Sequence, residues 1–260
     1  MLASLQSFIA QARARQRDAR LAAMPRHTQG TDLLGGHTVC FNDAAAYLQQ
    51  RNEIFYRGIY HFKPVQAQPR VLDCGGNLGL SAIFFRQQYP SARVTVFEPD
   101  PAIADICAHN LAAFGYQDDV ELVRKAVWTH DTTLHFDAKG AAAGRVVEGN
   151  AATVEVPATA LRSYLEREAV VDMVKIDIEG AEHAVLPAIA DQLHKVANLF
   201  VEYHSFAGQA QNLAGLLQII TQAGFRYYLE TEVKIADAPL RDKLEFEGMD
   251  AAVMIFCYRV

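Results

Sequence analysis

The stretch Val71-Leu72-Asp73-Cys74-Gly75-Gly76-Asn77-Leu78-Gly79 decides the fold of this 260-residue chain. It has the pattern of a buried strand that runs into a glycine-rich turn, and an apolar segment with helical spacing follows over residues 77–89. A turn of this kind lets a ligand approach the backbone closely. The helix that follows offers unpaired N–H groups to an anionic part of such a ligand. The stretch therefore predicts the first strand–turn–helix unit of a parallel sheet.

The same alternation of short β-branched runs and longer amphipathic segments continues to the end of the sequence, which is typical of α/β folds. Strands are expected at Arg70–Cys74, Arg93–Glu98, Val120–Trp128, Val171–Asp177, Leu199–His204, Phe225–Glu230 and Ala251–Arg259. Helices are expected at about 77–89, 101–115, 159–168, 181–192 and 209–223. The pattern predicts a doubly wound sheet, for which we expect the strand order 3-2-1-4-5-7-6.

Two regions interrupt the alternation. In the segment 129–158, short strands at Thr132–Phe136 and Thr153–Val156 flank the Gly/Ala-rich stretch Lys139–Ala152, which is expected to be a mobile loop. Before residue 70, residues 31–69 show no clear period. We therefore expect a helical N-terminal extension or cap over residues 1–69 and one α/β domain over residues 70–260, with 129–158 as an insertion.

Composition narrows the class of protein. Hydrophobic residues make up 51% of the chain, and 24 basic side chains face 30 acidic ones, for a formal net charge of −6. This excludes a disordered chain and argues against nucleic-acid binding, which needs a basic surface. Apolar runs are too short to span a membrane, and four cysteines without regular spacing favour a reducing, cytoplasmic location. The arginine-rich residues 1–26 predict an amphipathic helix that docks on the body, with a targeting or anion-binding segment as the alternative.

Carboxylates mark the ends of the first two predicted strands. A dinucleotide fingerprint would need glycine where Cys74 stands, which weakens a nicotinamide-cofactor interpretation. Asp73 would repel a pyrophosphate but suits hydroxyls, an ammonium group or a water network. Glu98, 19 residues beyond Gly79, can accept hydrogen bonds from both hydroxyls of an adenosine ribose. That contact suits NAD and S-adenosylmethionine equally, and a merely solvated strand end is the plain alternative.

The ends of the fourth and fifth predicted strands hold the best catalytic candidates. Lys175 and Asp177 are two residues apart and share a face, and so do Glu202 and His204. Because ligands bind outside the carboxyl ends of parallel strands, Asp177 is expected to face the ligand, with a simple Lys175 ion pair as the alternative. His204 is the best candidate to titrate near neutral pH. A divalent cation on Asp177, Glu202 and His204 remains an alternative, although no metal ligand is assigned.

As a set, these residues resemble the FkbM family of S-adenosylmethionine-dependent methyltransferases. The resemblance runs over about residues 53 to 258 and rests on the glycine turn, on Phe97-Glu98-Pro99, on Lys125-Ala126-Val127, and on the stretch from Val174 to Glu182. The last, Val174-Lys175-Ile176-Asp177-Ile178-Glu179-Gly180-Ala181-Glu182, is the most family-specific. The family's turn usually has alanine or another small residue where Gly76 stands, a mild departure.

The resemblance implies a class I methyltransferase fold of seven strands with the last antiparallel, residues 70–260 forming the S-adenosylmethionine-binding domain. It implies that Asp73, Gly75, Asn77 and Gly79 line the methionine part of the donor, that Glu98 holds the ribose, and that Lys125-Ala126-Val127 borders the adenine. With Gly76, Pro99 and Tyr60 added, these are the expected cofactor-binding residues. Tyr60 and the loop 139–152 are expected to close over the acceptor.

The reaction that the resemblance implies is O-methylation of a hydroxyl on a small natural product or a sugar. His204 is expected to remove the hydroxyl proton, with Asp177 or Glu202 orienting it or binding the acceptor. An NAD-dependent oxidoreductase and a catalytically silent binding protein on the same fold are the alternatives. No membrane or nucleic-acid partner is expected, and a homo-oligomer is left open.

Overall fold

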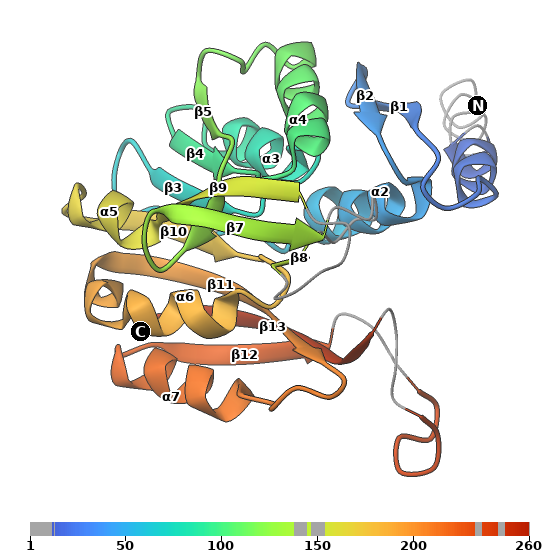
Figure 1. Ribbon diagram of the computed structural model, residues 1–260. Coiled ribbons are helices and arrows are strands. Elements are labelled where there is room, and N and C mark those ends of the chain that lie inside the picture. The colour runs from blue at the N-terminus through green and yellow to red at the C-terminus, as the bar shows by residue number, and fades with distance from the viewer. Residues whose placement is uncertain are drawn as a thin grey trace, which may run out of the picture.

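A seven-stranded sheet forms the centre of the computed structural model (Figure 1), which describes residues 12, 14–137, 145–146, 154–231, 236–243 and 248–259. Its strands are β3 (Arg70–Cys74), β4 (Arg93–Phe97), β5 (Val120–Val123), β10 (Val171–Ile176), β11 (Val196–Phe206), β12 (Arg226–Thr231) and β13 (Met249–Tyr258). Their spatial order is β5-β4-β3-β10-β11-β13-β12, which is 3-2-1-4-5-7-6 when the seven are counted along the chain. The strand β13 is antiparallel to both of its neighbours. The four pairings among β5, β4, β3, β10 and β11 are parallel. The expected α/β class is confirmed.

Helices cover both faces of this sheet. They are α2 (Ala44–Arg51), α3 (Leu80–Gln88), α4 (Pro101–Ala113), α5 (Leu161–Glu166), α6 (Glu182–Ala188) and α7 (Leu213–Gln222), with the π-helix η1 (Asn52–Arg57) and the 3-10 helix η2 (Ala190–Lys195). One buried cluster joins α2, α3 and α4 to Val71 and Val94, and the other joins α5, α6 and α7 to Leu72 and Cys74. Neighbouring residues of β3 thus belong to opposite cores, which is why its sequence is apolar without alternation.

Local signals set several helix ends as the sequence predicts. Pro101 opens α4, and the Asp100 side chain before it accepts a hydrogen bond from the Ala102 N–H at 2.8 Å. Gly115 and Gly224 follow the ends of α4 and α7 with φ angles of 74° and 83°. Left-handed backbone at these positions favours glycine and ends each helix.

The expected single strand Val120–Trp128 is wrong. The chain turns at residues 124–125, where the Lys125 N–H donates to the Val123 carbonyl at 2.9 Å. Only β5 joins the main sheet, and β6 (Ala126–Trp128) pairs with β9 (Val154–Ala160) in a second sheet of order β6-β9-β7-β8. The sequence suggested one strand because residues typical of strands stand on both sides of Arg124 and Lys125, with no glycine or proline between them. The other strands of this sheet are β7 (Thr132–Asp137) and β8 (Arg145–Val146).

The part of the chain before residue 70 contains more than helix. Residues 14–22 are helical, and a hairpin of β1 (Gly30–Leu34) and β2 (His37–Phe41) precedes α2 and η1. Arg51 is almost fully buried and forms ion pairs with Asp32 at 3.1 Å and Asp18 at 2.9 Å, which ties the helical residues to the hairpin and to α2. The proposed division at residues 69 and 70 stays a prediction.

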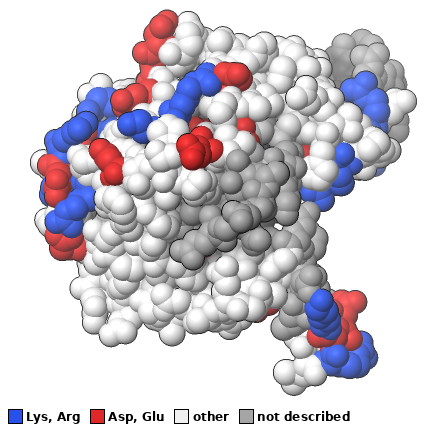
Figure 2. All heavy atoms as spheres, in the orientation of Figure 1, with Lys and Arg blue, Asp and Glu red and all other residues white. Residues whose placement is uncertain are grey.

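Figure 2 shows one face of the molecule. Acidic and basic side chains are interleaved on one part of that face, and the rest of it is largely uncharged. No helix among the described residues has the length and apolar character needed to cross a membrane. The four cysteines are free thiols, as their irregular spacing predicts.

Candidate functional site

The glycine turn after β3 is locked between two neighbouring strands. Gly75 has a φ of 87°, and a Cβ atom built on it would lie 1.8 Å from the Asp177 carbonyl oxygen. The Gly75 and Gly76 N–H groups donate to the Phe97 carbonyl at 3.1 Å and 2.8 Å. Only glycine fits at residue 75, because this backbone conformation and this close approach both exclude a side chain. The turn therefore lies directly against the end of β10.

Glu98 lies at the tip of β4, where the sequence places it. Its carboxylate accepts hydrogen bonds from the Asn77 N–H at 2.9 Å and the Asp100 N–H at 3.0 Å. The side chain is buried, and burial raises the pKa of Glu98 to about 7, against the two backbone hydrogen bonds that lower it. A carboxylate held in this way beside the glycine turn can accept hydrogen bonds from ligand hydroxyls.

This pKa gives the first testable prediction. Between about pH 4.5 and pH 7 the folded chain holds the Glu98 proton more tightly than the unfolded chain, so the stability contributed by Glu98 falls as the pH rises through that window. Glu98→Gln removes this titration. We expect the free energy of unfolding of Glu98→Gln, relative to wild type, to increase by roughly 3 kcal/mol between pH 5 and pH 8. Urea unfolding at both pH values checks this, and parallel pH dependence of the two proteins would contradict it.

Lys175 is the centre of a buried ion-pair cluster at the junction of β3 and β10. Its Nζ donates to the Gly75 carbonyl at 2.8 Å and lies 3.4 Å from Asp73 Oδ1 and 3.1 Å from Asp177 Oδ2. Burial alone lowers the pKa of Lys175, but Asp177, Tyr60 and Asp73 raise it well above its ordinary value. Lys175 is therefore a permanent cation that joins the glycine turn to β10.

His204 lies on β11, surrounded by carboxylates. Its Nε2 is 3.6 Å from Glu179 Oε2 and 3.7 Å from Glu202 Oε1, and its Nδ1 is 3.3 Å from Glu182 Oε1. Burial alone lowers the pKa of His204, whereas these carboxylates, Glu179 first, raise it well above the ordinary histidine value. The carboxylates therefore favour the protonated ring, and a protonated Nε2 can act as a base only after its proton passes to a neighbouring group.

Glu182 fixes the backbone around this cluster. Its two oxygens accept hydrogen bonds from the Gly180 N–H at 2.8 Å and the His204 N–H at 2.7 Å, and the side chain is fully buried. Glu179, with a φ of 54°, and Gly180, with a φ of 96°, form the turn that leads from β10 to α6. This turn places Glu179 next to His204.

The structure brings most of the sequence-predicted residues to one edge of the sheet. Tyr60 is buried beside the Lys175 cluster, with Lys175 Nζ 5.8 Å from the centre of its ring, and burial raises the pKa of Tyr60 well above its ordinary value. Pro99 is half-buried next to Glu98, Ala126 and Val127 are buried, and Lys125 is exposed. Asp73 is fully buried, with Ser81 Oγ donating to it at 2.5 Å. The loop 139–152 lies outside the described residues except for β8. Their roles stay predictions.

Sequence reasoning missed three residues of this site. Lys175 was considered as a partner of Asp177 on the face toward the ligand, and Glu179 and Glu182 as acids near the ligand within a family motif, but none of the three was given a role. The dense charge of residues 175–182 was the available signal. It could not show that Lys175 reaches back to Asp73 and Gly75, about 100 residues earlier in the chain, or that Glu182 holds the His204 backbone.

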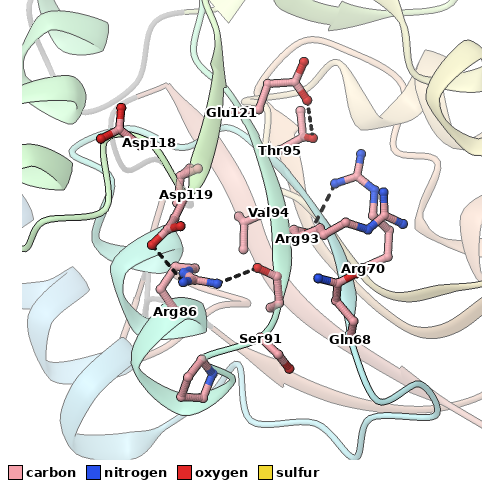
Figure 3. A pocket seen from close by; sticks show the side chains of 13 residues that line it. Gln68, Arg70, Arg86, Ser91, Arg93, Val94, Thr95, Asp118, Asp119 and Glu121 are labelled. Atoms are coloured by element: carbon pink, nitrogen blue, oxygen red, sulfur yellow. Dashed lines mark hydrogen bonds and ion pairs between the residues drawn. The ribbon is translucent and has the colours of Figure 1, made fainter.

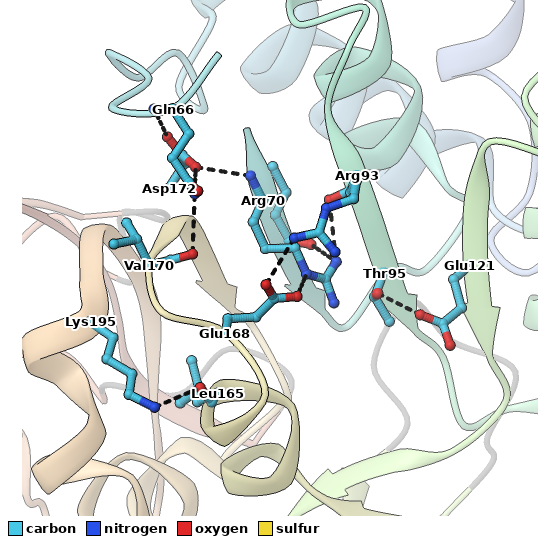
Figure 4. Close-up of polar contacts among 11 residues, drawn as sticks. Gln66, Arg70, Arg93, Thr95, Glu121, Leu165, Glu168, Val170, Asp172 and Lys195 are labelled. Atoms are coloured by element: carbon cyan, nitrogen blue, oxygen red, sulfur yellow. Dashed lines mark hydrogen bonds and ion pairs between the residues drawn. The ribbon is translucent and has the colours of Figure 1, made fainter. Parts of the chain in front are cut away.

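A pocket of about 540 Å³ lies elsewhere, at the starts of β3, β4 and β5 (Figure 3). Its arginines already have partners: Arg86 pairs with Asp119 at 2.9 Å, and Arg70 and Arg93 both bind Glu168 (Figure 4). Asp172 also accepts hydrogen bonds here from the Gln66 side chain and the Arg70 N–H. These contacts hold the amino-terminal edge of the sheet together, and none of the predicted site residues lines the pocket.

Comparison with known proteins identifies a family domain that begins within the stretch containing the glycine turn. Residues 73–227 match the model of the methyltransferase FkbM domain. The chain is similar to the methyltransferase sdnD of Sordaria araneosa, with 25% identity over 205 residues that cover 64% of this chain and 78% of that protein. It is also similar to methyltransferase 1 of Beauveria bassiana, with 23% identity over 191 residues that cover 64% of this chain and 77% of that protein.

Solved structures show the same fold. A SAM-dependent methyltransferase from Agrobacterium tumefaciens superposes with a TM-score of 0.50 and 12% identity, covering 91% of this chain and 71% of that one. A methyltransferase FkbM from Methylobacillus flagellatus KT has a TM-score of 0.49 and 12% identity, covering 77% of this chain. The match spans 46% of the length of that protein. Because the domain model matches more than half of the sequence, the chain belongs to the FkbM methyltransferase family.

Proposed function

We propose that this chain is an S-adenosylmethionine-dependent O-methyltransferase that acts on a hydroxyl of a small natural product or a sugar. The observation that carries the proposal is the contact between Gly75 and the Asp177 carbonyl. Because of this contact, the glycine turn after β3, which would bind the donor, lies directly against the end of β10. The chain continues from there to the acid–base side chains around His204. Donor and acceptor can then meet at one edge of the sheet, as ligands do in doubly wound folds.

The residues at this edge fit the donor. The Glu98 carboxylate is positioned to accept hydrogen bonds from the two ribose hydroxyls, and the turn Gly75, Gly76, Asn77 and Gly79, with Asp73 behind it, would hold the methionine part. Pro99, Lys125, Ala126 and Val127 would border the adenine. When bound, the donor supplies an electrophilic methyl group on a sulfonium. The carboxylates of Asp177, Glu179 and Glu202 favour a cationic ligand nearby.

The protein must align the two reactants and exclude water, and alignment of this kind is worth about 7–11 kcal/mol of the barrier. It must also take the acceptor proton. We assign this step to His204 Nε2, after the ring has given its own proton to Glu179 or Glu202, whose oxygens lie 3.6 Å and 3.7 Å away. Asp177 or Glu202 then orients the ring or binds the acceptor. Tyr60, with its ring centre 5.8 Å from Lys175 Nζ, would close over the acceptor.

Two results test this proposal against its alternatives. Isothermal titration is expected to show binding of S-adenosylmethionine and none of NAD, because Cys74 replaces a glycine of the dinucleotide turn. A screen of sugar and polyketide hydroxyls with labelled donor is expected to release S-adenosylhomocysteine. NAD binding without S-adenosylmethionine binding would favour an oxidoreductase. Donor binding without release for every acceptor would favour a silent binding protein.

A further inference from the structure

Three side chains next to the proposed acceptor site present ligand atoms to one point. Asp177 and Glu179 follow β10, His204 lies on the neighbouring β11, and one ligand atom from each lies within 4.8 Å of the others. Glu202, two residues before His204 on β11, brings a third carboxylate, with Oε1 3.7 Å from His204 Nε2. Nitrogen and oxygen donors from two adjacent strands thus converge.

The His204 ring is the most informative member of this set. Only 2% of His204 is exposed, and its Nδ1 has no hydrogen-bond partner among the described residues. Its Nε2 also lies beyond hydrogen-bond distance of Glu179 and Glu202, at 3.6 Å and 3.7 Å. A buried polar atom without a hydrogen bond is rare in folded proteins. Of the two ring nitrogens, Nε2 is the one that faces the carboxylates of Glu179 and Glu202, because Nδ1 lies on the side of Glu182.

The spacing of the donors fits an ion rather than direct hydrogen bonds. Metal–ligand bonds of about 2.0–2.2 Å place two ligand atoms of one ion about 3–4.4 Å apart. The distances from His204 Nε2 to the two carboxylates fall in this range. On the other side of the ring, Glu182 Oε1 lies 3.3 Å from Nδ1. In metal sites, a carboxylate near the second ring nitrogen of a histidine commonly orients that histidine toward the metal.

We propose that Asp177, Glu179 and His204 bind one divalent cation, with Glu202 as a fourth ligand. One imidazole with carboxylates suits Mn²⁺ or a similar first-row ion better than Ca²⁺, which prefers oxygen ligands alone. Asp177 Oδ2 lies 3.1 Å from Lys175 Nζ, and Asp177 can keep this contact while its other oxygen, Oδ1, binds the cation. With a cation on His204 Nε2, that nitrogen no longer serves as the base: the cation would hold the acceptor hydroxyl and lower its pKa, and a neighbouring carboxylate would take the proton. This role rests on the proposed function. The binding itself does not.

Titration of the full chain with Mn²⁺, after treatment with EDTA and desalting, tests the site without donor or acceptor. Electron paramagnetic resonance of free Mn²⁺ is expected to show one saturable site per chain. Glu179→Gln is expected to raise its Kd at least about tenfold. The matched control Asp118→Asn, an exposed acid at the opposite edge of the sheet, is expected to leave the Kd unchanged.

The outcomes separate this proposal from the proposed function. Absence of saturable Mn²⁺ binding, or an equal Kd for wild type and Glu179→Gln, would overturn the cation site, even if S-adenosylmethionine binds. Saturable Mn²⁺ binding that Glu179→Gln weakens supports the site, even if no acceptor is methylated. Because the Glu179 side chain is 21% exposed, Glu179→Gln tests the ligand set without opening a buried cavity. His204→Gln is expected to raise the Kd for Mn²⁺ at least as much as Glu179→Gln does.

Discussion

Lys175→Met is expected to lower the free energy of unfolding by about 3–5 kcal/mol. Methionine keeps most of the volume of lysine but leaves the fully buried Asp73 carboxylate without its cation. Burial raises the pKa of Asp73 even with Lys175 present, so its charged form depends on this partner. The substitution also removes the hydrogen bond from Lys175 Nζ to the Gly75 carbonyl, which joins the glycine turn to β10.

Urea unfolding followed by circular dichroism measures this loss. Lys175→Met combined with Asp73→Asn is expected to recover part of the stability, because the second change removes the unpaired charge. Arg124→Met, which breaks an exposed ion pair with Asp105, is the matched control and is expected to have a much smaller effect. If Lys175→Met and Arg124→Met behave alike, the buried cluster does not hold the two strands together.

The parts of the site that are local in sequence were the predictable ones. Gly75 and Glu98 stand directly after strands, and turn chemistry and strand-end position are enough to place them beside each other. The same holds for the glycines after α4 and α7, whose left-handed backbone is a local requirement. These features depend on a few neighbouring residues, which a single sequence contains.

The parts that depend on distant residues were not predictable. The turn at residues 124–125 sends β6 to a second sheet, and its only local trace is the charged pair Arg124 and Lys125, without the glycine or proline that usually indicates a turn. The hairpin β1–β2 was missed because its burial depends on packing against α4 and on the Arg51 ion pairs rather than on its own pattern. The protonated state of His204 likewise comes from three carboxylates, of which Glu179 and Glu182 are contributed by another strand end.

His204→Gln is expected to reduce kcat by about 10²–10⁴-fold while the Kd for S-adenosylmethionine stays unchanged. The loss follows from either role of the ring, proton acceptor or cation ligand, because glutamine has neither the basicity nor the geometry of imidazole. Donor binding is preserved because Glu98 and the glycine turn lie on β4 and β3, away from β11. Steady-state kinetics and isothermal titration of the same preparation measure the two quantities.

A control variant, His183→Gln, and the addition of excess Mn²⁺ distinguish His204 as the base from His204 as a cation ligand. His183→Gln is the matched control, since His183 Nε2 contacts only the His204 carbonyl at 2.8 Å, and we expect it to retain turnover. If His204 acts as the base, excess Mn²⁺ does not restore turnover to His204→Gln, because no other group accepts the proton. If His204 is a cation ligand, excess Mn²⁺ restores part of it, because Asp177, Glu179 and Glu202 remain. Wild-type turnover in His204→Gln with intact donor binding would refute both roles. Proton removal would then be assigned to the carboxylates alone.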